Sequence, residues 1–93
     1  MTQATNGAVE HGKQIVVLDR GFVYVGEVKT DGQWCTISGA RCVRRWGTKK
    51  GLGELAASGP LENTVLDPAG TVQAPMRAVI ALLKCEAEKW TEH

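Results

Sequence analysis

Residues 22–38, FVYVGEVKTDGQWCTIS, contain the pattern that decides the fold of this 93-residue chain. The first part, Phe22–Lys29, is rich in β-branched and aromatic residues, which favour strands. Gly26 within it suggests a bulge or a close backbone approach. The second part, Gln33–Ser38, alternates polar and apolar side chains, as a half-buried strand does. Asp31–Gly32 between them tolerates the positive φ angles of a tight turn, so we expect an antiparallel hairpin.

Further β-type segments flank the hairpin on both sides. Gln14–Leu18 (QIVVL) is a short apolar run of the kind found in strands buried on both faces. Arg41–Trp46 is expected to continue the hairpin's second strand. Neither of its faces is cleanly apolar, so the pattern leaves open which one is buried. We also expect two short strands around a turn at Asp67–Gly70, over Asn63–Leu66 and Thr71–Gln73.

The second half of the chain contains one clear helical pattern and one ambiguous segment. Leu52, Leu55 and Ala56 recur at the spacing of a short amphipathic helix. Gly59–Pro60 is expected to end that helix, because glycine suits the left-handed cap and proline cannot continue. Arg77–Lys84 fits either a helix or a buried strand, and its residues alone favour a helix.

Cysteine and histidine positions argue against metal or covalent chemistry. Cys35, Cys42 and Cys85 are odd in number and show no C-x-x-C spacing, so we predict reduced thiols without a zinc site. His11 and His93 fall in the expected chain ends, and a cysteine nucleophile would therefore lack a positioned base. No cofactor is expected, and the sequence predicts a protein that is not an enzyme. The chain shows no apolar segment of a signal peptide or membrane span, which predicts a cytoplasmic protein that does not bind membranes.

Positive charge is concentrated in one stretch. Arg41–Gly53 contains five of the eleven Lys and Arg residues and no acidic residue, although the formal net charge of the chain is only +1. Cations, a tryptophan and glycines before a helix suit a phosphate-bearing ligand, with the indole stacking on a base. The stretch is not a P-loop, because Glu54 and Leu55 stand where lysine and a hydroxyl residue would be needed. The candidate ligand-binding residues are Arg41, Arg44, Arg45, Trp46, Lys49, Lys50, Gly51 and Gly53.

Several short segments together resemble a family of small uncharacterised phage and prophage proteins. They are GFVYVGEV (Gly21–Val28), TISGAR (Thr36–Arg41), Trp46, GLGELAASGP (Gly51–Pro60) and VIALLKCEAEKW (Val79–Trp90). The family pattern differs in having asparagine near Ser38–Gly39 and proline at Lys84. The resemblance implies a strand over Arg77–Lys84, followed by a helical turn from Glu86. It implies no catalytic residue.

These patterns lead to one fold and one domain organisation. We expect a flexible N-terminal tail over residues 1–12 and a single small β-rich domain over residues 13–93. The domain is predicted to be mainly β (β or α+β), either a small curled sheet or an SH3-like barrel of five or six strands. One short helix and a C-terminal helical turn complete it.

The function predicted from charge and resemblance together is binding without catalysis. We expect a phage accessory protein that sequesters a phosphate-bearing nucleotide signal of its infected bacterial host, acting as a homo-oligomer in the cytoplasm. A nucleic-acid-binding module is one alternative, although the near-neutral net charge of the chain disfavours it. A protein–protein inhibitor of a host defence or polymerase complex is another.

Overall fold

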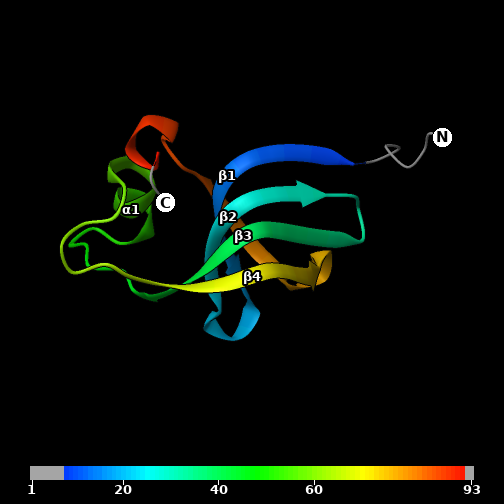
Figure 1. The fold of residues 1–93 in the computed structure, drawn as a ribbon. Helices are drawn as coiled ribbons and strands as arrows, with labels where there is room; N and C mark the ends of the chain where they lie inside the picture. Colours follow the sequence, from blue (N-terminus) through cyan, green and yellow to red (C-terminus); the bar gives the residue numbers. More distant parts are fainter. Residues whose placement is uncertain (1–7, 92–93) are drawn as a thin grey trace.

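Five antiparallel strands form one curled sheet in the computed structural model, which describes residues 8–91 (Figure 1). The elements are β1 (Val9–Leu18), η2 (Asp19–Gly21), β2 (Val23–Thr30), β3 (Trp34–Arg45), α1 (Leu52–Ser58), β4 (Val65–Pro75), η3 (Met76–Ala78), β5 (Val79–Lys84) and η4 (Ala87–Lys89). The strand order is β4-β3-β2-β1-β5, so β4 and β5 are the two edges. The sheet is not closed between these edges, and the curled sheet is therefore the correct one of the two predicted forms. The prediction of a mainly β fold is confirmed.

The predicted hairpin is formed by β2 and β3. The Asp31 side chain stabilises its turn, because Oδ1 accepts hydrogen bonds from the backbone N–H groups of Trp34 (2.8 Å) and Gln33 (3.0 Å). These bonds favour the ionised carboxylate and lower the pKa of Asp31. Gly32 takes the positive φ of 93° that the turn requires.

Gly26 lies at a close approach of two strands, one of the two possibilities that the sequence suggested. The bulge itself is in β3, because Gly39 and Ala40 together stand opposite Gly26 in the pairing. A Cβ at Gly26 would lie 2.7 Å from Cγ2 of Ile37 and 2.8 Å from the carbonyl oxygen of Ser38, so only glycine fits the close approach of the two strands. Val25 and Val28 are three residues apart on β2, so they point to opposite faces of the sheet and belong to different hydrophobic clusters.

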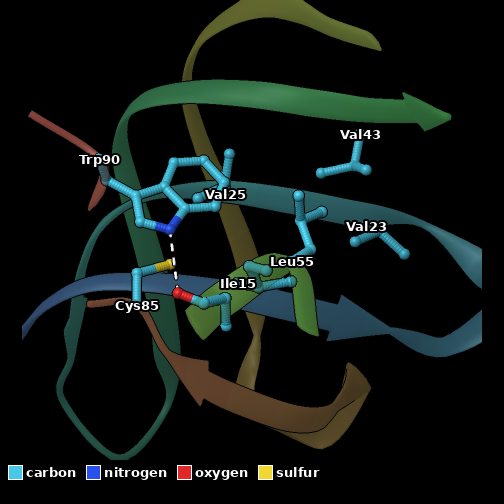
Figure 2. Packing of buried hydrophobic residues seen from close by; sticks show 8 residues of the cluster. Ile15, Val23, Val25, Val43, Leu55, Cys85 and Trp90 are labelled. Carbon is cyan, nitrogen blue, oxygen red and sulfur yellow. Dashed lines mark hydrogen bonds between the residues drawn. The ribbon is translucent and has the colours of Figure 1, made fainter. Parts of the chain in front are cut away.

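The two faces of the sheet carry separate hydrophobic clusters. One face packs against α1 and the C-terminal turn (Figure 2), using Ile15, Val23, Val25, Val43, Leu55, Ala56, Cys85 and Trp90. On the other face, side chains from both edge strands join a second cluster made of Val16, Leu18, Val28, Cys35, Ile37, Ala40 and Ala74. Because adjacent residues of β1 belong to different clusters, the prediction of a strand buried on both faces is confirmed. Val43 answers the open question about β3, since it is buried while Arg44 and Trp46 on the other side of the strand are exposed.

The N-terminal strand begins earlier than the sequence indicated. β1 starts at Val9, so the predicted loose tail is wrong for residues 9–12, and residues 1–7 lie outside the described part of the chain. Pairing with β2 holds this polar stretch in place, as Val9 lies opposite Thr30. His11 is therefore part of a strand, and its Nε2 lies 2.9 Å from Oγ1 of Thr30. Hydropathy could not reveal a strand end that depends on backbone pairing rather than burial.

A single bulged strand, β4, replaces the two short strands expected around Asp67–Gly70. Its pairing with β3 continues through this stretch, with Arg41 opposite Pro68 and Ala40 opposite Gly70. An edge strand tolerates proline because one side of its backbone needs no partner, and Gly70 absorbs the extra residue at φ 73°. Residues that usually mark a turn here form a bulge instead.

The C-terminal segment contains a strand, as the resemblance implied, and not the helix that its residues alone favoured. β5 is a strand that pairs with β1, and a single 3-10 turn, η4, comes after it. Both faces of β5 contribute to hydrophobic clusters, with Leu83 packed against the first and Leu82 against the second. Apolar contacts on both faces account for most of the continuous apolar run, although its residues are only half-buried and Ile80 is exposed. The short helix α1 also matches its prediction, and Gly59 ends it at φ 80°.

Candidate ligand-binding site

The predicted cationic residues lie along the end of β3 and the loop that leads into α1. Arg41, Arg44 and Arg45 are on β3, and Lys49 and Lys50 are in the loop. The two lysines, Arg44 and Arg45 are exposed, while Arg41 is half-buried. The structure thus places the five cations on one continuous segment at the α1 end of the molecule, away from the β2–β3 hairpin turn (Figure 1).

One of these cations has an acidic partner. Nη1 of Arg44 lies 2.8 Å from Oδ2 of Asp67 on β4, and the two side chains are 65% and 47% exposed. An exposed pair of this kind adds roughly 0–1 kcal/mol to stability. Its main consequence is electrostatic, because it compensates one of the five positive charges. Arg41, Arg45, Lys49 and Lys50 form no ion pair within residues 8–91.

Trp46 is fixed at its backbone while its ring stays accessible. Its carbonyl oxygen accepts a hydrogen bond from Oγ1 of Thr64 at 2.7 Å. The next residue, Gly47, has φ 72° and lies so close to the Asn63–Thr64 backbone that a Cβ would be 2.5 Å from the Thr64 nitrogen. The Trp46 side chain is nevertheless 43% exposed. An anchored backbone with an exposed indole can stack on a base without a large ordering cost.

The glycine-rich loop already holds an anion of its own. Oε1 of Glu54 accepts hydrogen bonds from the backbone N–H groups of Lys50 (2.8 Å) and Lys49 (3.1 Å). Oγ1 of Thr48 donates to the carbonyl oxygen of Gly51 at 2.8 Å and tightens the same turn. The lysine amides are therefore occupied by a carboxylate, and the lysine side chains are the donors that remain accessible. That Gly51 and Gly53 bind a ligand stays a prediction.

A shallow pocket adjoins the cationic segment. It has a volume of about 300 Å³ and is lined by Arg41, Pro60, Leu61, Thr64 and Leu66. Among the predicted residues Arg41 contributes to it, whereas the exposed lysines do not. The cations therefore do not all converge on one concave surface.

Three residues that shape this region were missed by the sequence reasoning. Glu54 could have been found, because it is the third residue of the helix after the Gly51 cap, the spacing at which an acid bonds back to preceding amides. Asp67 and Thr64 left no such signal. Their roles depend on the pairing of β3 with β4, which brings residues far apart in sequence together.

Within residues 8–91, the three cysteines are free thiols, and two of them are buried. Burial raises the pKa of Cys35, and it raises the pKa of Cys85 to about 11, so both thiols stay protonated at neutral pH. Cys42 is half-buried and free. Within residues 8–91 no three His, Cys, Asp or Glu side chains are grouped as a metal site would need. His93 lies outside the described residues.

Comparisons with family models, curated proteins and solved structures found no match to this chain. Within residues 8–91, every helix is too short or too polar to cross a membrane. The candidate site therefore rests on the geometry of this chain's own residues.

Proposed function

We propose that the protein binds a phosphate-bearing nucleotide ligand and does not catalyse a reaction. The observation that supports this most directly is that Trp46, with an exposed ring, belongs to the same short segment as the exposed cations Arg45, Lys49 and Lys50, which form no ion pair within residues 8–91. An exposed indole and cationic side chains that remain accessible offer both interactions that a nucleotide needs. Its base stacks on the indole, and its phosphate is attracted by guanidinium and ammonium groups.

The biological role that fits this binding is sequestration. In the phage setting implied by the resemblance, the protein would lower the free concentration of a nucleotide signal in the infected bacterial host. A homo-oligomer would favour this role, because a second subunit placed over the cationic segment would enclose a ligand that a single subunit leaves open to water. Both statements belong to the proposal.

Replacing Trp46 with alanine is expected to weaken nucleotide binding about 5-fold or more, because base stacking contributes about 1–3 kcal/mol. Isothermal titration calorimetry would measure this with mononucleotides, cyclic di- and trinucleotides and cyclic ADP-ribose variants. Trp34→Ala is the matched control, since Trp34 is 41% exposed but lies at the hairpin end of the sheet. The proposal fails if the wild-type protein binds none of these at micromolar concentrations. It also fails if the two variants lose affinity equally.

Nucleic-acid binding is the second candidate function, and the open position of the loop lysines favours it. Lys49 and Lys50 are exposed in the loop before α1 and do not line the pocket beside Arg41. An open row of cations suits an extended polyanion, which makes many weak contacts along a surface. The same tryptophan could stack on successive bases of a single strand.

If this second function is correct, affinity for a labelled oligothymidylate should fall steeply as NaCl is raised. Each phosphate contact adds roughly 0.7 to the logarithmic salt slope for a single strand, so Lys49→Ala/Lys50→Ala should lower the slope by about 1.4. Fluorescence anisotropy at several salt concentrations measures the slope, and Lys29→Ala/Lys84→Ala, at exposed positions on β2 and β5, is the control. Salt-independent affinity would exclude this mode of binding.

A further inference from the structure

The pocket beside Arg41 shares a structural element with Trp46. Oγ1 of Thr64 donates to the Trp46 carbonyl oxygen at 2.7 Å and accepts a hydrogen bond from the Leu61 backbone N–H at 2.9 Å. Thr64 and Leu61 both line the pocket. One hydroxyl therefore links the segment that presents the indole to the wall of the neighbouring cavity, and the positions of the two features are coupled.

The composition of the pocket suits a flat ring with a nearby negative charge. Pro60, Leu61 and Leu66 supply apolar contacts within a largely polar lining, and the Arg41 guanidinium supplies one cation without an acidic partner within residues 8–91. Its volume of about 300 Å³ is at the lower end of the range for ligand pockets, so it has room for one ring system. Arg41 can contact a phosphate attached to that ring through a charge-assisted hydrogen bond.

The spacing along β3 sets the length of ligand that could use both features. Arg41 and Arg45 are four residues apart, which is at most about 13 Å along a strand, because β3 shifts register against β4 between them. Trp46 follows Arg45 directly. A ligand that stacks on the indole and also enters the pocket must reach from Trp46 past Thr64 to Arg41, which suits two linked nucleotides better than one.

We infer that this pocket is a second base-binding subsite, and that the preferred ligand contains two bases joined through phosphate. This inference rests on the proposed function. One base stacks on Trp46, Arg45 and the loop lysines attract the connecting phosphate, and the second base lies against Leu61 with Arg41 at its phosphate or edge. A free dinucleotide and a dinucleotide unit of a single-stranded nucleic acid share this chemistry.

The test compares 5′-AMP with the linear dinucleotide pApA by calorimetry on the full chain. The wild-type protein should bind pApA at least about 5-fold more tightly than AMP, since each additional stacked base contributes about 1–3 kcal/mol. Arg41→Ala should remove most of this advantage while AMP affinity changes less than about 2-fold. Leu61→Trp, at an exposed position on the rim, should block the pocket and have the same selective effect. Arg77→Ala, an exposed arginine outside this region, is the control.

The outcomes separate this inference from the proposed function. If AMP and pApA bind equally, or if Arg41→Ala and Leu61→Trp weaken both ligands alike, the second subsite is wrong while nucleotide binding stands. If neither ligand nor any other nucleotide binds, both fail. A ten-residue oligoadenylate distinguishes the two sources of the ligand. Tighter binding of the oligomer than of pApA points to nucleic acid, and equal or weaker binding points to a free dinucleotide.

Discussion

Replacing Trp90 with alanine is expected to be the most destabilising single change in this chain. Trp90 is 1% exposed and packs in the cluster between the sheet and α1. Its indole Nε1 also donates to the Ala56 carbonyl oxygen at 3.0 Å, which connects the C-terminal turn to the helix (Figure 2). Truncation of a buried tryptophan costs about 3–5 kcal/mol, a large part of the roughly 5–15 kcal/mol of a small domain.

Circular dichroism during chemical denaturation measures this loss without depending on the removed fluorophore. Trp34→Ala and Trp46→Ala are matched controls, because both rings are about two-fifths exposed. Each should cost less than about 1 kcal/mol. The stability loss of Trp90→Phe should lie between that of Trp90→Ala and those of the two controls. It keeps an aromatic ring, and the Ala56 carbonyl still accepts the Glu86 N–H at 3.0 Å. A Trp90→Ala variant as stable as the Trp34→Ala variant would show that the C-terminal turn does not stabilise the domain.

Gly59→Ala is expected to destabilise the domain by at least about 2 kcal/mol. Gly59 has a φ of 80°, a left-handed conformation that costs an L-residue about 1–2 kcal/mol. A Cβ there would also overlap the carbonyl oxygen of Lys89 in the C-terminal turn. Backbone atoms cannot move aside as a flexible side chain can, so the helix end and the turn must separate, at an added cost of about 1–3 kcal/mol.

Gly53→Ala is the matched control for this prediction. Gly53 lies within α1, has no positive φ, and a Cβ there would meet no atom within 4 Å. Alanine is the better helix former by about 1 kcal/mol, so this variant should be neutral or slightly more stable. Thermal unfolding of the two variants under identical conditions makes the comparison. Equal melting temperatures would contradict the close packing of the helix end against the C-terminal turn.

Local patterns predicted those elements whose signals are contained within a few residues. The hairpin turn follows from Asp31 and Gly32, the close approach of β2 and β3 from Gly26, and α1 from the spacing of its leucines together with Gly59. In each case the backbone preference of a residue and the tertiary structure agree. The strand β5 could not be predicted from its residues alone, because burial on both faces removes the alternation that separates a strand from a helix.

The candidate site was only partly predictable for a related reason. The sequence shows the cluster of cations, which is Arg41, Arg44, Arg45, Lys49 and Lys50. It does not show which acidic residues offset part of their positive charge. The Asp67 partner of Arg44 depends on the β3–β4 pairing, and the pocket beside Arg41 depends on the loop after α1 folding back beside that strand. The carboxylate of Glu54 on the loop amides was recognisable only from helix-cap spacing.

The sequence by itself determined the β-rich class, the central hairpin, the short helix and the concentration of positive charge, because each depends on the conformational preference or charge of neighbouring residues. Tertiary structure decided that the polar residues at the start of β1 pair as a strand and that Asp67–Gly70 form a bulge instead of a turn. It also decided which of the cations forms an ion pair. These depend on hydrogen bonds and ion pairs between strands distant in the chain. No local pattern specifies such contacts until the register of the sheet is fixed.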